Sequence, residues 1–336
     1  MELTGIVVFA IILAIAFDIV NGFHDAANSI ATIVSTRVLS PRMAVLWAAF
    51  FNFVALLIFG EGVAKTISGI INIDPSDKAF VYVVLSGLVG AIIWNLMTWW
   101  WGLPSSSSHA LIGGLSGAGV TYGGWGILVK SKLYLTLWFI LGAPIIGFIL
   151  AYLIMLMTFW ALRKTRPRTI DKGFRLGQLA SSALYSIGHG GNDAQKTMGI
   201  IVALLIASGQ MTKDFDHVPM WIVICSYGAM AFGTAMGGWR IVKTMGMRLT
   251  KLRPVGGFCA EVAGAITLFV ATHFKIPVST THTITGAIIG VGSTTKVRGI
   301  RWGLASRIVW AWIFTIPMSA GMSAATLLVL HRMHVW

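Results

Sequence analysis

Acidic residues are scarce in this chain: its 336 residues include 11 Asp and Glu against 25 Lys and Arg, and only 11% of all residues are charged. Ordinary soluble domains carry about 25% charged residues, so this composition excludes that class. Hydrophobic residues reach 56%, and the mean hydropathy is +0.81. The composition is that of a protein embedded in a lipid bilayer.

Cysteine is also rare. Cys225 and Cys259 lie far apart in apolar segments, without a CxxC pair and without a cluster of His residues. This pattern excludes a disulfide framework and a zinc centre, and both thiols are interpreted as packing residues. We expect no cofactor.

Apolar runs recur from end to end, which excludes a single-pass anchor. A helix needs about 20 apolar residues to cross a membrane. The first run, from Met1 to Phe17, lacks the basic segment and the small-residue cleavage site of a signal peptide, so we expect a retained first helix. The prediction is an all-α polytopic membrane protein with about 10–12 membrane helices. The runs of the first half lie near 4–21, 25–36, 43–61, 79–102, 106–122 and 133–161.

The net charge of +14 comes from Lys and Arg residues in short loops between apolar runs, a distribution that indicates membrane orientation and not nucleic-acid binding. Cytoplasmic loops are enriched in Lys and Arg. We therefore place the basic loop 163–174 in the cytoplasm of a multi-pass protein of the inner (cytoplasmic) membrane. Further basic clusters lie at 240–253 and 296–301, whereas acidic residues mark two segments expected outside, at Asp74 and Asp77 and at Asp214 and Asp216.

The two halves of the chain repeat one another. Weak internal symmetry of this kind is common in transporters. It predicts an N-terminal repeat over 1–162, the basic linker 163–174 and a C-terminal repeat over 175–336. Three blocks match in the same order: 21–28 with 189–196, 63–67 with 241–245, and 104–113 with 277–286.

Loop charges predict that the repeats are inverted. The basic loop 240–253 matches the loop 63–78, which carries acidic residues, so matched loops face opposite sides. Matched loops face opposite sides only if each half crosses the membrane an odd number of times. The number is odd if the regions 4–36 and 175–208 each cross once, as helices broken at Asn21–Asp25 and at Gly188–Asp193. The segments around Pro104 and Pro277 then form helical hairpins, and both termini lie outside.

Ionisable residues inside a membrane cost about 2.5–3.5 kcal/mol on insertion scales and mark sites or pathways. Asp25 and Asp193 occupy equivalent positions in the two halves, and Asn28 and Asn192 lie beside them. Carboxylate, amide and unwound backbone oxygens suit Na⁺ or a relayed proton, so these four residues are predicted to bind the coupling ion. In the alternative interpretation the glycines serve helix packing and each Asp caps a half-helix.

Two hydroxyl-rich blocks follow Pro104 and Pro277. Prolines suit the first turn of a helix, and the hydroxyls and free N–H groups at a half-helix N-terminus suit a tetrahedral oxyanion. The alternative is that the hydroxyls only cap the helices. His109 and His282 follow each block and are secondary candidates, as proton carriers or as residues that support the ligands. The predicted anion ligands are Ser105, Ser106, Ser107, Ser108, Ser279, Thr280 and Thr281.

Other embedded polar residues have no acidic counterpart in the opposite repeat. Asn21, Glu261, Asp18 and Glu61 are secondary candidates for ion coupling. Lys65 and Lys243 lie near predicted helix ends, where we expect them to extend to the interface.

These motifs resemble the PiT family of inorganic phosphate transporters, related to the solute carrier 20 proteins, and above all its bacterial low-affinity type. The matching residues are 22–28, 190–196 and the two hydroxyl blocks with their histidines, and the resemblance covers essentially the whole chain. It implies symport of phosphate with Na⁺ or H⁺, with a metal–phosphate complex as substrate in some bacterial members. Within the motif, Gln195 and Lys196 are added as phosphate-binding candidates. Lys196 stands where symmetry would place the partner of Asn28, and it favours proton coupling, while one Na⁺ site at the Asp and Asn residues stays open.

Several alternatives remain open from the sequence. Sulfate would accept the same donors as phosphate. A serine hydrolase using His109 or His282 is disfavoured because Ser108 and His109 would point about 100° apart on one helix. A passive channel is disfavoured by the inverted repeat. The expected partners are inorganic phosphate, a coupling cation and the lipid bilayer, with a homodimer as a candidate assembly.

Overall fold

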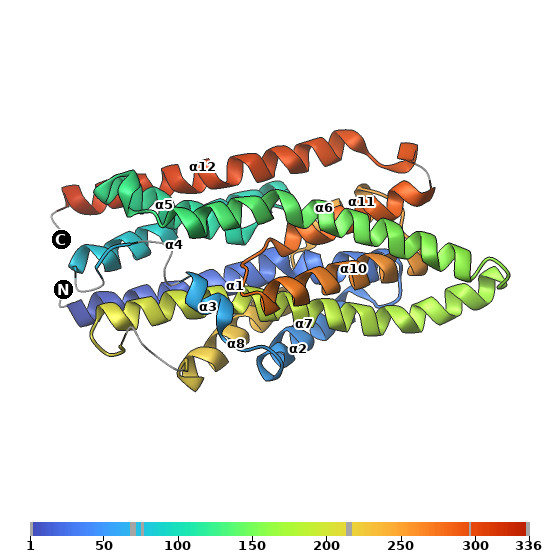
Figure 1. The fold of residues 1–336 in the computed structure, drawn as a ribbon, viewed down its shortest axis with the longest axis horizontal. Coiled ribbons are helices and arrows are strands. Elements are labelled where there is room, and N and C mark those ends of the chain that lie inside the picture. Colours follow the sequence, from blue (N-terminus) through green and yellow to red (C-terminus); the bar gives the residue numbers. More distant parts are fainter. Residues whose placement is uncertain (1–2, 68–71, 75–76, 213–216, 296, 334–336) are drawn as a thin grey trace.

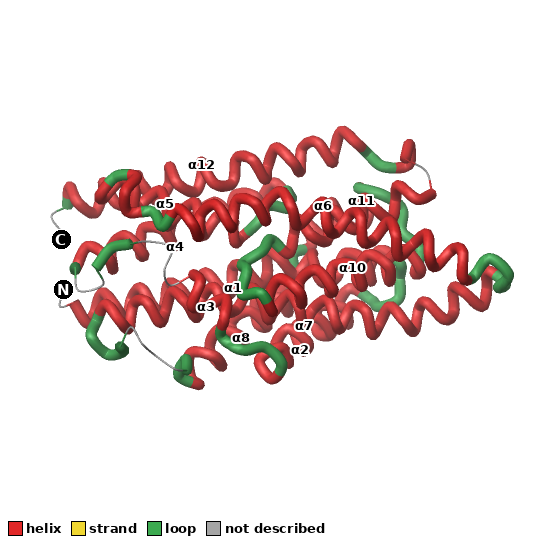
Figure 2. Tube along the Cα trace, viewed as in Figure 1, coloured by secondary structure: helices red, strands yellow, loops and turns green. Residues whose placement is uncertain are grey.

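The computed structural model describes residues 3–67, 72–74, 77–212, 217–295 and 297–333. Asp214, Asp216 and Lys296, which the charge analysis used, lie outside these residues. The described chain is a bundle of twelve α-helices without a β-strand (Figures 1 and 2). The all-α polytopic prediction is therefore confirmed.

The helices follow the same order in both halves. The first half contains α1 (Leu3–Ser35), α2 (Pro41–Val54), α3 (Gly62–Ile67), α4 (Lys78–Trp101), α5 (Ser107–Gly123) and α6 (Lys130–Ala161). The second contains α7 (Pro167–Ala207), α8 (Met220–Met236), α9 (Trp239–Val242), α10 (Pro254–His273), α11 (Thr280–Thr295) and α12 (Trp302–Arg332). Short 3₁₀ turns lie at Ala55–Leu57, Trp125–Ile127 and Val297–Gly299, and a π-helical turn lies at Lys243–Arg248.

Packing between the halves is reciprocal: α5 packs on α12 and α11 packs on α6, while α1 packs on α8 and α7 packs on α2. In Figure 1, α1 and α7 run in opposite directions, and so do α6 and α12. Inverted repeats require this arrangement. Both termini lie at one end of the bundle, and the α6–α7 turn lies at the other. Which end faces the cytoplasm stays a prediction, as does the division at 162 and 175.

Five of the described helices are long and apolar enough to cross a membrane: α1, α4, α6, α10 and α12. A sixth span is formed if α8 is combined with the segment Trp239–Arg248, from which it is bent by 62°. The expected 10–12 membrane helices thus include elements that are shorter or less apolar than these five. The helices α5 and α11 have only 17 and 16 residues, and α7 carries charged side chains along its length.

The predicted positions of the helix breaks were wrong. Both α1 and α7 run without interruption through Asn21–Asp25 and Gly188–Asp193. The glycines there serve close packing instead, as in the alternative interpretation: a Cβ on Gly22 would collide with the backbone of Met230, and one on Gly190 with the backbone of Asn52. Close approach of helix backbones at small residues is common in membranes.

The breaks lie between α4 and α5 and between α10 and α11. Gly102 ends α4 with a φ of +67°, and Lys275 adopts a φ of +62° just after α10. Pro104 and Pro277 lie inside these breaks, each three residues before the next helix begins. They therefore do not open the helices as predicted; the chain turns at Pro104, where the Ser105 amide donates to the Leu103 carbonyl at 2.9 Å.

Candidate anion and cation site

The hydroxyl blocks place the N-termini of α5 and α11 inside the bundle. Ser106 Oγ accepts a hydrogen bond from the His109 amide at 3.3 Å, and Ser279 Oγ accepts one from the His282 amide at 3.2 Å. These two hydroxyls therefore cap their helices. All residues of 105–108 and 279–281 are buried. The remaining free N–H groups of each first turn carry the positive end of a helix dipole, an arrangement that suits a buried anion.

Lys196 of α7 connects the two blocks. Its Nζ donates to Ser108 Oγ at the start of α5 and, at 3.0 Å, to the carbonyl oxygen of Val278 just before α11. The same ammonium is paired with Asp193, and the side chain is only 2% exposed. A positive charge at this depth needs a counter-charge, which Asp193 supplies. The contacts to Ser108 and Val278 place Lys196 where the starts of α5 and α11 meet.

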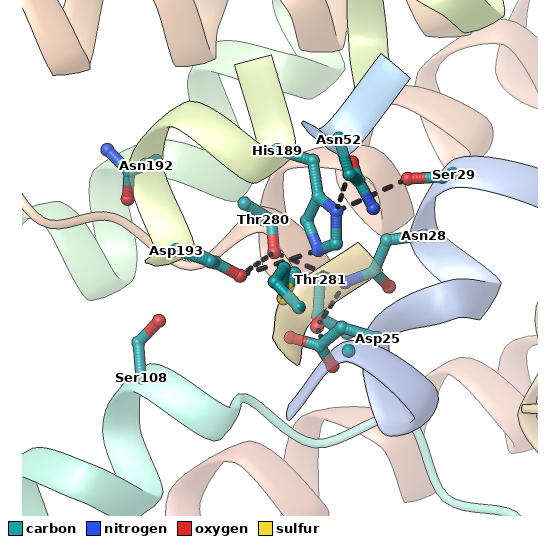
Figure 3. A network of polar contacts seen from close by, with 12 residues as sticks. Asp25, Asn28, Ser29, Asn52, Ser108, His189, Asn192, Asp193, Thr280 and Thr281 are labelled. Carbon is teal, nitrogen blue, oxygen red and sulfur yellow. Dashed lines mark hydrogen bonds and ion pairs between the residues drawn. The ribbon is translucent and has the colours of Figure 1, made fainter. Parts of the chain in front are cut away.

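The two predicted carboxylates belong to one network (Figure 3). Asp193 accepts from Thr280 Oγ1 at 3.2 Å, while Asp25 accepts from Thr281 Oγ1 at 3.3 Å. Asn28 donates to both threonine hydroxyls, at 3.2 and 2.9 Å. The motif on α1 and the motif on α7 thus meet at the start of α11.

Two histidines that the sequence analysis did not select complete this network. His24 Nδ1 lies 2.8 Å from Asp25 Oδ1, and His189 Nε2 lies 3.4 Å from Asp193 Oδ2. Asp25, His189 and Asp193 each offer a ligand atom within 4.8 Å of the others, so this buried group is able to hold a cation. His189 lies four residues before Asp193, and that spacing on one helix was a usable signal. Asn52 of α2, 3.2 Å from His189 Nδ1, belongs to no motif.

Ser105 contacts α1 and not the junction at Lys196. Its hydroxyl donates to Thr98 Oγ1 at 2.8 Å and lies 3.4 Å from His24 Nε2. Ser105, His24 and Asp25 therefore follow the order of a hydrolase triad, but Thr98 takes the serine proton that the histidine of a triad would accept. The contacts tie the α4–α5 break to the Asp25 motif.

Asn192 and Gln195 support the backbone. Asn192 donates to Thr272 Oγ1 at 3.0 Å and accepts from the Val278 amide at 3.2 Å, so it holds the α10–α11 break in place. Gln195 accepts from the Val63 amide at 2.9 Å and donates to the Gly191 carbonyl. Both side chains position elements of the site, and neither points at the other predicted ligands in these contacts.

The secondary candidates lie apart from Lys196. The His109 and His282 rings contact each other edge to face at 4.5 Å, and His282 stacks on Trp312. Glu261 accepts hydrogen bonds from Thr32, Gln178 and Ser181 in a separate buried cluster. The Ser107 hydroxyl is buried without a hydrogen-bond partner among the described residues, and Asn21 lies beside Asp18.

A cavity of about 890 Å³ lies near the α6–α7 turn, away from these motifs. Basic side chains line part of it, and none of the predicted anion or cation ligands does. The basic residues are Arg163, Arg248, Lys251, Arg253 and Arg301.

An all-α bundle with matched halves and a buried polar core defines this chain as a polytopic membrane transporter. The sequence model of the phosphate transporter family (PHO4) matches residues 21–323. The chain therefore belongs to the phosphate transporter family, and it is a transporter and not an enzyme. This confirms the resemblance drawn from the motifs.

Relatives and a solved structure agree with this assignment. A probable low-affinity inorganic phosphate transporter of Rhizobium meliloti is 56% identical over 94% of this chain and 93% of its own length. One of Bacillus subtilis is 42% identical, over 96% of this chain and 97% of its own length. A solved structure described as the sodium-dependent phosphate transporter superposes with a TM-score of 0.87 at 25% identity, covering 97% and 99% of the two chains.

Proposed function

We propose that this chain carries inorganic phosphate across the cytoplasmic membrane as a secondary active symporter, coupled to H⁺ or Na⁺. The observation that carries the proposal is the junction at Lys196, where a buried ammonium meets the starts of α5 and α11. Two helix N-termini and one cation provide donors and positive charge for a tetrahedral anion. The names of the relatives support phosphate as that anion.

In this proposal phosphate binds between the two half-helix starts. The N–H groups of the first turns and the hydroxyls of Ser107, Ser108, Thr280 and Thr281 donate to its oxygens. Lys196 neutralises part of its charge. Asp25 and Asp193 accept hydrogen bonds from a protonated phosphate oxygen, which sulfate lacks near neutral pH. The carboxylates therefore favour phosphate over the sulfate alternative.

Phosphate and the cation are coupled because phosphate and Asp193 compete for the Lys196 ammonium. Without phosphate, the ammonium is paired with Asp193. When phosphate takes over Lys196, the buried Asp193 carboxylate loses its partner and gains affinity for a cation near His189 and Asp25. Each ligand thereby strengthens the binding of the other, which is the thermodynamic requirement for symport. Asn28 offers a further oxygen, Oδ1, that has no hydrogen-bond partner among the described residues.

We further propose the orientation that the loop charges predict, with the 163–174 linker in the cytoplasm and both termini outside. A homodimer and a metal–phosphate substrate also remain proposals, without support from a contact in the described chain.

The test is transport by the purified protein in liposomes. We expect labelled phosphate to exchange in counterflow, and to accumulate when an inward H⁺ or Na⁺ gradient is imposed. Excess unlabelled phosphate should abolish the signal, and equal sulfate should leave it largely intact. Counterflow that sulfate blocks as well as phosphate does would establish the broader oxyanion permease instead. Absence of phosphate counterflow from a folded preparation would refute the proposal.

A further inference from the structure

Asp18 on α1 is a buried carboxyl group without a basic side chain in direct contact. None of its surface is exposed, it forms no ion pair among the residues that the structure describes, and its hydrogen-bonding neighbours Thr197 and Asn21 are uncharged. An ionised carboxylate loses its hydration at such a place, and the cost is large unless a positive charge or a proton compensates it. Asp18 therefore requires a compensating positive charge.

The surroundings of Asp18 supply oxygen atoms. Thr197 of α7 and Asn21 of α1 face its carboxyl group, and Tyr227 of α8 lies close to it. The Thr197 and Asn21 side chains offer hydrogen bonds to Asp18, and the Tyr227 hydroxyl shares one with Gln195. With the Asp18 oxygens they form an oxygen-rich pocket between three helices. Such oxygens bind a hard cation, and they equally accept a hydrogen bond from a protonated carboxyl group.

The carboxylates of the proposed symport site differ from Asp18 in this respect. Asp193 is paired with Lys196 and accepts from Thr280, and Asp25 is paired with His24 and accepts from Thr281. Both have a basic side chain in direct contact, whereas Asp18 has none among the described residues.

The charges that act on Asp18 come from α7. Asp193 repels it and Lys196 attracts it, and the Tyr227 hydroxyl faces it from α8. Among the other helices that pack on α1, α2 and α4 each carry a single charged residue, Arg42 and Lys78, exposed at the helix start. Asp193 and Lys196 cancel one another, so the pocket keeps one negative charge. One monovalent cation neutralises it.

We infer that the Asp18 pocket is a second site for the coupling ion, occupied by one H⁺ or one Na⁺ during each transport cycle. This inference rests on the proposed symport and deepens it. In addition to the cation bound near Asp193, His189 and Asp25, it places one driving ion at a site lined by Asn21, Thr197 and Tyr227, beside the phosphate site and distinct from it. The exchange of phosphate alone needs only that the pocket be neutral, while uphill transport needs the pocket to load and release its ion.

The experiment compares Asp18→Asn with wild type in liposomes, with Asp171→Asn as the matched control. Asp171 is exposed at the start of α7, where it pairs with Arg175. Asparagine mimics the neutralised carboxyl group in size. We expect Asp18→Asn to keep phosphate counterflow within about threefold of wild type and to lose gradient-driven accumulation by about tenfold or more, since the contribution of one coupling ion is removed but the phosphate site remains. Asp171→Asn should behave as wild type.

A pH gradient and a Na⁺ gradient imposed separately identify the ion. Whichever gradient drives wild-type uptake is the one on which uptake by Asp18→Asn should depend less steeply. Gradient-driven accumulation at the wild-type level in Asp18→Asn overturns the inference, and so does loss of counterflow in a variant that still purifies as a folded species.

If Asp18→Asn does not fold, Asp18→Glu replaces it. This variant keeps the charge but moves it by one methylene, so the concentration of driving ion at half-maximal uptake should shift by about threefold or more. An unchanged ion dependence contradicts the inference. If wild-type protein shows no phosphate counterflow, the proposed function itself fails, which is a separate outcome.

Discussion

The two halves of this transporter are built alike but differ in charge at two matched positions. Asn28 in the first half corresponds to Lys196 in the second, and counting back from the pair Asn21 and His189 matches Asp18 with Ser186. Ser186 is buried and satisfied by the Ser182 carbonyl at 2.8 Å. The first half thus has an extra acid, and the second has an extra base. The two matched halves therefore carry an asymmetric charge distribution. Lys196 places a positive charge at the starts of α5 and α11, and Asp18 on α1 is an acid without a basic partner among the described residues.

The largest effect is expected at the carboxylates that both halves share. Asp193→Asn removes the partner of Lys196. A buried charge that is left without its partner lowers the free energy of unfolding by about 3–5 kcal/mol. Asp25→Asn removes an acceptor for Thr281 but leaves the Lys196 pair intact. We expect both variants to lose phosphate uptake by about 100-fold or more in liposomes, with the greater loss of folding yield in Asp193→Asn. Undiminished uptake in both would remove these residues from the mechanism.

The second prediction makes the halves alike. Lys196→Asn gives α7 the residue that α1 carries at Asn28. Without the ammonium, Asp193 binds the external cation more tightly and phosphate loses a counter-charge, so uptake should fall by about tenfold and reach half-saturation at a lower cation concentration. Uptake measured against cation concentration tests this, with Lys164→Asn in the exposed α6–α7 turn as the control. An unchanged cation dependence would mean that Lys196 plays no part in coupling.

The smallest effect is expected where a side chain only positions the backbone. Asn192→Ala frees the Val278 amide and loosens the α10–α11 break, whereas the matched residue His24 contacts a carboxylate directly. We expect the KM for phosphate to rise by about three- to tenfold while the maximal rate stays near wild type, since one or two hydrogen bonds of about 1 kcal/mol are lost. Initial uptake rates over a range of phosphate concentrations separate the two parameters. A collapse of the maximal rate would indicate direct participation in transport.

Much of this architecture was predictable from the sequence because composition and repetition report it directly. Apolar runs predicted the helical bundle, and the matched blocks selected Asp25, Asp193 and the two hydroxyl segments as candidate site residues. The breaks were misplaced because a glycine pair permits either an unwound helix or a close helix contact, and only the neighbouring backbone at Met230 and Asn52 decides between them.

Other parts of the site depend on contacts that leave no local pattern. Asn52 reaches His189 from a helix without a motif, and Lys196 reaches Val278 across 82 residues. Whether a buried acid is compensated is likewise a property of the packed structure. Glu261 is held by three hydrogen-bond donors, whereas Asp18 has only Thr197 and Asn21 beside it and no basic partner among the described residues, although both are single acids in apolar segments.

Equilibrium binding of phosphate to the purified protein tests most directly the claim that the two half-helix starts form an anion site around Lys196. Calorimetric titrations of wild type, Lys196→Met and the exposed control Lys164→Met measure the contribution of the ammonium. The account predicts that Lys164→Met binds as wild type and that Lys196→Met binds about tenfold or more weakly, because a charge-assisted contact contributes roughly 1.5–3 kcal/mol. Equal phosphate affinity in all three proteins, each shown to be folded, would contradict it.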